Sequence, residues 1–220
     1  MTWNVPNILT ILRLLAAPGI VLMFLYFARP WADWFALLLF VSAAITDFFD
    51  GYLARLWKQQ TKFGAMLDPI ADKAMVVIAL LVITGYAGMN PWILLPATVI
   101  MFREVFVSGL REFLGDTAGT LAVTKLAKWK TTAQMVAIAV LFATGIFGHM
   151  LLDRVTGMDE AVVAEIFAGG TDPLNLRLID LAARVTWWGG VLLLWVAAVL
   201  TLVTGIDYFR KATPFLRDDP

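Results

Sequence analysis

The sequence predicts an all-α integral membrane protein with six transmembrane helices. Of its 220 residues, 60% are hydrophobic and only 15% are charged, whereas a soluble domain has about 25% charged residues. Several apolar runs reach the length of about 20 residues that a helix needs to cross a bilayer. Short polar or Gly/Pro segments separate most of these runs, so we expect a single membrane domain over residues 1–220.

The apolar runs give the order and approximate bounds of the expected helices. We expect helices at 8–28, 33–57, 65–86, 91–114, 125–148 and 184–208. The connection 149–183 is unlike the others because it is long, polar and acidic, and we predict that it is an extracytoplasmic insertion. Within it, 159–168 is either a short amphipathic helix on the membrane surface or a loosely packed loop. The sequence alone does not separate these alternatives.

The distribution of positive charge predicts the orientation in the membrane. Six spans place both termini on one side, and Lys and Arg are enriched on the cytoplasmic side of membrane proteins. Of the 17 Lys and Arg residues, the opposite side receives only Arg29, Arg154, Arg177 and Arg184. We therefore expect both termini in the cytoplasm. The net charge of zero gives no indication of a nucleic-acid partner, and the absence of Cys excludes disulfides and thiolate metal sites.

Four aspartates flank the connection between the second and third expected helices. They are Asp47, Asp50, Asp68 and Asp72. On a helix the first two lie about 60° apart and the last two about 40° apart, so two antiparallel helices can direct both pairs at each other. Packed carboxylates repel unless they are protonated or bind a cation. Mg²⁺ or Mn²⁺ accepts such oxygen ligands, and a cluster of this size can hold two ions for displacement at phosphorus.

Residues around the aspartates agree with a phosphate site at the cytoplasmic membrane face. Gly51 and Gly64 allow a ligand to approach the backbone, and Ala54 leaves further room. Arg55 can meet a phosphate or pair with a carboxylate. The alternatives are that the aspartates form a proton relay, a structural group or a solvated surface pair.

The pattern Asp47-x2-Asp50-Gly51-x2-Ala54-Arg55-x8-Gly64-x3-Asp68-x3-Asp72 resembles the signature of the CDP-alcohol phosphotransferase family at every defined position. The resemblance implies the six-span fold of that family and transfer of a phosphatidyl or similar group from a CDP-linked donor to an alcohol, with release of CMP. It also implies a two-metal site at the four aspartates, with Asp72 as the general base. Gly51, Ala54, Arg55 and Gly64 would then shape the CDP pocket.

The start of the chain also resembles the start of that family. The matching residues are Pro6-Asn7-x2-Thr10-x2-Arg13, and the resemblance places Asn7 and Thr10 near the nucleotide. Taken without the resemblance, the segment is an ordinary helix start with Asn7 as the N-cap.

A second polar cluster bears on the acceptor alcohol. It contains Arg103-Glu104, Arg111-Glu112 and the lysines Lys125, Lys128 and Lys130. Arginines within a span are costly, so these residues either clamp an acceptor that carries its own phosphate or form ion pairs and a lipid-facing positive flank. The chemistry of the residues alone leaves both interpretations open.

The surrounding segments REVFVSGLREF and KLAKWKTTAQM resemble those of bacterial family members that use CDP-diacylglycerol and glycerol 3-phosphate. This resemblance implies that Arg103, Arg111 and Lys128 contact the acceptor phosphate, with Lys125 and Lys130 as further candidates. It also implies a homodimer in the bacterial inner membrane. The 149–183 connection is longer than the resemblance leads us to expect.

Three other functions fit part of the sequence. The same chemistry with inositol phosphate, serine or a second phospholipid as acceptor would keep the aspartates in their roles. A cation-coupled transporter would use the aspartates as ion ligands, but it leaves the glycines and the spacing unexplained. A membrane prenyltransferase would also use Mg²⁺ and a diphosphate, but its aspartate motifs are spaced differently.

Overall fold

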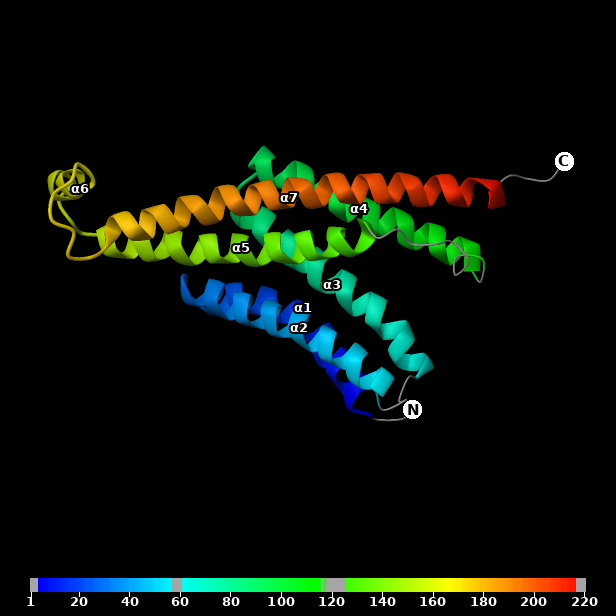
Figure 1. The fold of residues 1–220 in the computed structure, drawn as a ribbon. Coiled ribbons are helices and arrows are strands. Elements are labelled where there is room, and N and C mark those ends of the chain that lie inside the picture. Colours follow the sequence, from blue (N-terminus) through cyan, green and yellow to red (C-terminus); the bar gives the residue numbers. More distant parts are fainter. Residues whose placement is uncertain (1–3, 57–60, 116, 118–125, 217–220) are drawn as a thin grey trace. The chain divides into compact units, whose positions relative to one another are not determined.

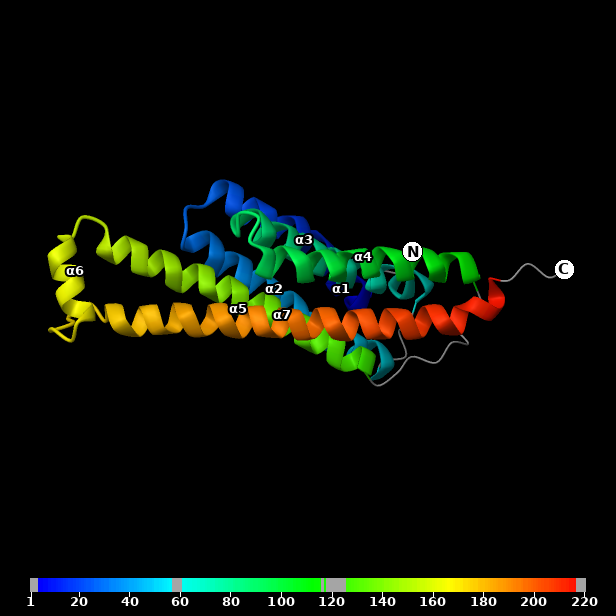
Figure 2. The same ribbon diagram turned by 90° about the horizontal axis from the view of Figure 1, so that it is seen from above.

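The computed structural model describes residues 4–56, 61–115, 117 and 126–216, without the side chains of 48–56, 127 and 128. Every regular element in this part of the chain is a helix, which confirms the predicted all-α class (Figures 1 and 2). The elements are α1 (Val5–Tyr26), α2 (Trp31–Leu56), α3 (Lys62–Tyr86), α4 (Pro91–Leu114), α5 (Leu126–Val155), α6 (Glu160–Phe167), α7 (Leu176–Ala212) and the 3-10 helix η2 (Thr213–Phe215).

The six long helices correspond in order to the six expected apolar runs. Among the described residues, four stretches are long and apolar enough to cross a membrane: Val5–Tyr26, Pro91–Leu114, Trp129–Val155 and Leu176–Phe215. These apolar helices indicate an integral membrane protein. That α2 and α3 also span the bilayer stays a prediction.

The connection 149–183 differs most from the expected organisation. Helix α5 continues to Val155 and α7 already begins at Leu176, so much of the expected insertion extends the two flanking helices. Between them lies α6, which begins after Asp159, whose side chain accepts a hydrogen bond from the backbone N–H of Ala161 at 2.9 Å. The helical alternative for 159–168 is therefore the one that the structure adopts.

The chain divides into two compact units. The first comprises Met1–Ile83 and Ile138–Gly190, and it contains α1, α2, nearly all of α3, and α6. The second comprises Thr84–Ala137 and Val191–Pro220, and it contains α4. Helices α5 and α7 each contribute one part to each unit because their sequences run through the boundaries.

Helix α1 has a polar buried face and an apolar exposed face. Its buried positions include Asn7, Thr10 and Arg13, which recur every three residues and so lie along one side of the helix. Large apolar side chains on its other sides are exposed; they include Ile8, Leu12, Leu15, Leu22 and Leu25. This arrangement suits a helix that faces hydrocarbon and encloses polar groups against neighbouring helices.

The start of α1 corrects one sequence-based expectation. The N-cap is Asn4, not Asn7, and the Asn4 side chain accepts a hydrogen bond from the backbone N–H of Asn7 at 3.0 Å. Pro6 follows within the first turn of the helix. A backbone N–H at this position would have no acceptor within the helix, so proline, which lacks an N–H, loses no hydrogen bond there. As a result Asn7 lies inside the helix, and its side chain is available for contacts with another element.

A partly buried ion pair lies at the start of α2 in the first unit. Asp33 is 1% exposed and accepts hydrogen bonds from Arg29, from Nε at 2.7 Å and from Nη2 at 2.6 Å. Gly145 of α5 lies against this pair, and a Cβ atom there would be 2.0 Å from the Asp33 Oδ1. The bidentate pair therefore occupies the space that the glycine leaves free.

Candidate active site

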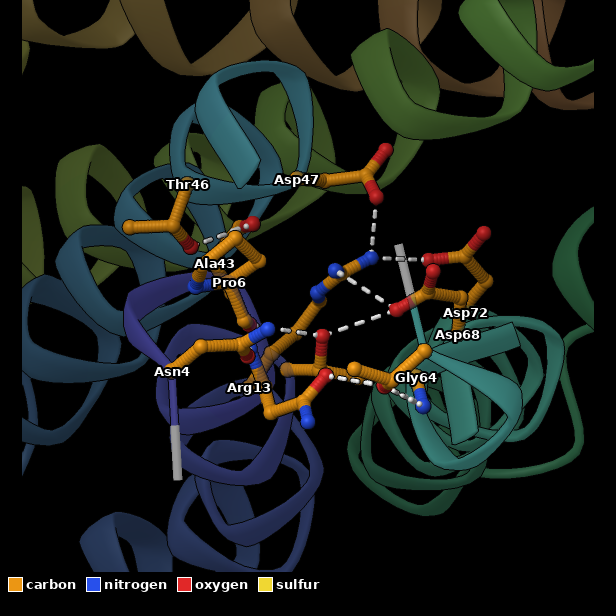
Figure 3. Close-up of polar contacts among 12 residues, drawn as sticks. Asn4, Pro6, Arg13, Ala43, Thr46, Asp47, Gly64, Asp68 and Asp72 are labelled. Carbon is orange, nitrogen blue, oxygen red and sulfur yellow. Dashed lines mark hydrogen bonds and ion pairs between the residues drawn. The ribbon is translucent and has the colours of Figure 1, made fainter. Parts of the chain in front are cut away.

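Three of the four predicted aspartates converge on one buried arginine in the first unit. Figure 3 shows the carboxylates of Asp47, Asp68 and Asp72 turned toward the guanidinium of Arg13. The arginine comes from α1, Asp47 from α2, and the other two aspartates from successive turns of α3. The carboxylate side chains are about half exposed, at 48, 49 and 54%, whereas the Arg13 side chain is 2% exposed. The carboxylates thus meet solvent and also a buried cation.

The contacts of Arg13 join three helices. Its Nη1 donates hydrogen bonds to the Oδ1 atoms of both Asp47 and Asp72, and its Nη2 lies 3.9 Å from Oδ1 of Asp68. A planar guanidinium offers several N–H donors in fixed directions, so one side chain can serve carboxylates from different helices. The cation explains how carboxylates of like charge lie together in this structure.

Thr10 lies one turn before Arg13 and holds one of the same carboxylates. Its hydroxyl donates to Oδ1 of Asp68 at 2.8 Å and also lies 3.1 Å from the backbone carbonyl of Pro6. Asp68 is therefore held from α1 by both a neutral donor and a cation. This places Thr10, a predicted nucleotide-binding residue, directly beside a predicted metal ligand.

Asn7 and Gly64, both predicted to lie at the nucleotide, are in contact. Thr61 donates its hydroxyl to the Asn7 amide oxygen at 2.9 Å and accepts from the backbone N–H of Gly64 at 3.0 Å. A Cβ atom on Gly64 would be 2.7 Å from that amide oxygen. The close approach of α1 and α3 at this level thus depends on glycine.

Some predicted site residues fall outside what the structure describes. Asp50, Gly51, Ala54 and Arg55 lie within α2, but their side chains are outside the described part. The same holds for Lys128 in α5, while Lys125 lies wholly outside the described residues. Their assigned roles stay predictions.

The donor set at Arg13 fits a hard divalent cation by its chemistry. All three acidic side chains offer oxygen atoms, which Mg²⁺ and Mn²⁺ prefer, and each is open to solvent on one side. Among the described residues, no three acidic or His side chains are close enough together to hold a metal. Because Asp47, Asp68 and Asp72 are arranged around the guanidinium, they would have to close together to share a metal ion.

The second unit contains a separate cluster of buried charges on α4 and α5. Glu104 accepts a hydrogen bond from Nη1 of Arg103 at 3.2 Å and another from Nζ of Lys130. Glu104 and Lys130 are 9% and 7% exposed. Of the two interpretations of this region, Arg103 adopts the ion pair with Glu104. The Nε of Arg103 is buried without a hydrogen-bond partner among the described residues. One carboxylate here balances two cations.

Helix α7 contacts two arginines of α4, Arg103 and the exposed Arg111. The Arg111 guanidinium carbon lies 5.3 Å from the ring centroid of Tyr208, in a cation–π arrangement. The stem of Arg103 passes Gly205, where a Cβ atom would be 2.9 Å from its Cγ. The Tyr208 hydroxyl is buried without a partner among the described residues. Tyr208 therefore contacts Arg111 through its ring.

Sequence reasoning missed the central role of Arg13 and the role of Tyr208. A signal for Arg13 was present, because a charged residue in the middle of an apolar span is costly and needs a partner. Its partners lie 34 to 59 positions away in the sequence, so the helix pattern could not identify them. No comparable signal marks Tyr208, since an aromatic residue near the end of an apolar helix is usually an interfacial anchor.

Comparisons with known proteins agree with the signature of four aspartates. The family model for CDP-alcohol phosphatidyltransferase matches residues 3–203. The CDP-diacylglycerol–glycerol-3-phosphate 3-phosphatidyltransferase of Cereibacter sphaeroides is 64% identical over 220 residues, which cover 100% of both chains. The protein of the same name from Escherichia coli K12 is 45% identical over 141 residues, which cover 63% of this chain and 76% of the relative.

Proposed function

The chain belongs to the CDP-alcohol phosphatidyltransferase family, and we propose that it transfers the phosphatidyl group of CDP-diacylglycerol to glycerol 3-phosphate in phospholipid biosynthesis. The observation that carries this assignment is the 64% identity with the Cereibacter sphaeroides enzyme over both whole chains. The acidic cluster on α2 and α3 supplies the chemistry that such a transfer needs.

The reaction is a displacement at the phosphorus of the phosphatidyl group. A hydroxyl oxygen of glycerol 3-phosphate forms a new P–O bond, the P–O bond to CMP breaks, and CMP leaves with the bonding electrons. The hydroxyl proton needs an acceptor as the bond forms, and we assign this role to the carboxylate of Asp72. In support, the Asp72 side chain is 54% exposed, so a substrate can reach it.

We assign Asp47, Asp50, Asp68 and Asp72 to the binding of two divalent ions, Mg²⁺ or Mn²⁺. When bound, such ions neutralise the pyrophosphate of the donor and the charge that develops on the leaving CMP. The protein's part is to hold the carboxylates on two adjacent helices at the level of the substrate. The convergence of three of them on Arg13 supports this assignment.

The nucleotide half of the donor is assigned to residues next to the aspartates. These are Asn7, Thr10, Gly51, Ala54, Arg55 and Gly64. The contacts of Asn7 with Gly64 and of Thr10 with Asp68 support a common site for this group. The acyl chains of the donor would remain in the bilayer while its nucleotide reaches the carboxylates.

The acceptor phosphate is assigned to the basic residues of α4 and α5. Arg103 and Lys130 carry two positive charges against the one negative charge of Glu104, so this ion-paired group carries +1. A phosphate monoester near neutral pH carries up to two negative charges and is well matched by arginine donors. Arg103, Arg111 and Lys128 are the main candidates for this role, with Lys125 and Lys130 as further candidates.

The orientation and assembly complete the proposal. We place both termini and the carboxylates at the cytoplasmic face of the bacterial inner membrane, because the excess of Lys and Arg falls on that side. We also expect a homodimer. The connection 156–175, with α6, would lie on the opposite side of the membrane.

The direct test is CMP release by the purified protein in detergent from CDP-diacylglycerol and Mg²⁺. Glycerol 3-phosphate, inositol phosphate, serine and no acceptor are compared, each with and without EDTA. We expect release with glycerol 3-phosphate only, and none in EDTA. Release with a different acceptor would retain the aspartate mechanism and overturn the assignment of Arg103 and Arg111. Absence of release from folded protein with every acceptor would overturn the proposed reaction.

A further inference from the structure

We propose that the Arg13 guanidinium takes the place of a divalent cation among the carboxylates of the metal-free protein, and that it yields the oxygens of Asp47 and Asp72 when the cation binds. Arg13 would then be a positioning residue that keeps the site assembled between catalytic cycles. The inference rests on the metal-binding part of the proposed function, and it concerns a residue that the proposed reaction itself does not use.

The Arg13 guanidinium lies between carboxylates of two helices. Nη1 has two hydrogens, and it donates hydrogen bonds to Oδ1 of Asp47 on α2 and to Oδ1 of Asp72 on α3. One nitrogen thus lies between carboxylate oxygens of two different helices, which is where a bridging cation would lie. A cation cannot occupy that place until the nitrogen moves away, because like charges at contact distance repel strongly at a poorly solvated site.

The charges around Arg13 leave room for a divalent ion. Among the described side chains, Asp47, Asp68 and Asp72 contribute three negative charges and Arg13 one positive charge, so these four side chains together carry −2. This negative excess attracts a cation from solution. Arg13 therefore lowers the repulsion enough for the carboxylates to assemble without fully neutralising them.

The burial of Arg13 separates this role from that of an ordinary surface pair. The Arg13 side chain is 2% exposed and extends from the buried face of α1, so water does not screen it as it screens an exposed lysine. The carboxylates are about half exposed, so a cation from solution can reach them. The protein thus supplies its own cation from the inside and can accept another from the outside.

Thr10 gives a reason why the metal would displace only part of the contact. Asp68 receives the Thr10 hydroxyl at 2.8 Å, while its distance to the Arg13 Nη2 is 3.9 Å. Asp68 therefore depends least on the guanidinium and keeps a donor when Arg13 withdraws. Asp47 and Asp72 are the carboxylates that the exchange would affect.

The test compares apparent Tm values of the purified protein in EDTA and in millimolar Mg²⁺. Arg13→Gln removes the internal cation, and we expect its Tm in EDTA to fall by about 5 °C or more, since unpaired carboxylates repel. Mg²⁺ should restore at least half of this loss in Tm. The rise in Tm on addition of Mg²⁺ should therefore be at least about twice as large in Arg13→Gln as in wild type. Lys62→Gln removes the same charge from an exposed position and should behave like wild type.

A charge-compensated variant keeps the proposal testable if Arg13→Gln does not fold. Arg13→Gln with Asp72→Asn returns the combined charge at Arg13 and its three aspartates to −2, and we expect it to be recovered folded with most of the wild-type Tm in EDTA. A merely structural arginine would give no such recovery. Failure of this double variant to fold, beside a normal Lys62→Gln protein, would overturn the proposal. An Arg13→Gln loss that Mg²⁺ does not reduce would also overturn it.

Electron paramagnetic resonance can measure the binding of Mn²⁺ to wild-type protein. This measurement tests the metal assignment separately from the role of Arg13. Mn²⁺ binding together with a wild-type response of Arg13→Gln to Mg²⁺ would overturn only the role of Arg13. Absence of Mn²⁺ binding by active, folded wild type would overturn both the metal assignment and this inference.

Discussion

The side-chain amide of Asn7, on α1, fills the space in which any residue other than glycine at position 64 of α3 would place its Cβ atom. The separation would be 2.7 Å from the amide oxygen and 3.3 Å from the Thr61 hydroxyl oxygen. The glycine of the family signature therefore has a packing reason as well as the predicted role in the nucleotide pocket. The same contact sets how closely α1 and α3 approach at the level of the carboxylates.

We expect Gly64→Ala to destabilise the protein by about 1–3 kcal/mol, because the new methyl group overpacks the contact with Asn7. Thermal unfolding measures the effect. Gly85→Ala in the same helix is the matched control, since apart from its chain neighbours and its own helix backbone nothing lies within 4 Å of the added Cβ, and we expect no loss there. Equal stability of the two variants would show that Asn7 moves aside without cost.

Gly145→Ala is expected to be more damaging, with a loss of about 3 kcal/mol or more. Its Cβ would be 2.0 Å from the Asp33 Oδ1 and 2.5 Å from the Arg29 Nη2, so this partly buried ion pair would have to separate. Gly148→Ala on the same helix has open space and serves as the control. A Gly145→Ala protein that unfolds at the temperature of the control would contradict this account of the pair.

Tyr208 is expected to act on the acceptor through Arg111, because its ring carries the guanidinium at 5.3 Å. Tyr208→Leu should raise the KM for glycerol 3-phosphate about threefold to tenfold, while the KM for CDP-diacylglycerol changes little, in line with a cation–π contact of roughly 1 kcal/mol. Tyr208→Phe keeps the ring and loses only a hydroxyl without a described partner, so its kinetics should stay near wild type. Equal changes in both KM values would indicate a general structural effect.

Asp72→Asn should lower the rate of CMP release by a factor of about 10² or more, because an amide cannot accept the hydroxyl proton. Binding of CDP-diacylglycerol should be largely retained, and titration of the purified variant with the donor measures it. Asp153→Asn, an exposed aspartate on α5, is the control and should turn over normally. Near-normal turnover by Asp72→Asn would remove it as the base.

The sequence by itself determined the features that depend on local periodicity and composition. The six long helices follow from apolar runs, and the bounds of α4, Pro91–Leu114, match the expected 91–114 because Asn90 caps the helix and Pro91 begins it. The four-residue spacing of Asp68 and Asp72 is sufficient to place them on neighbouring turns of one helix, without any tertiary contact. The signature of four aspartates was likewise sufficient to indicate the family.

Tertiary structure alone decided which groups meet across helices. Nothing in the helical period of α1 indicates that Arg13 contacts Asp47, Asp68 and Asp72, because such contacts depend on how three helices pack and not on any one of them. The same reason applies to Glu104, which binds Lys130 of α5 as well as its neighbour Arg103. The bounds of α5 and α7 were also misjudged, since the polar and acidic residues of 149–183 favour a loop by composition although part of that range is helical. Local sequence fixes which segments can form helices, whereas burial among neighbouring helices decides where the costly charges find their partners.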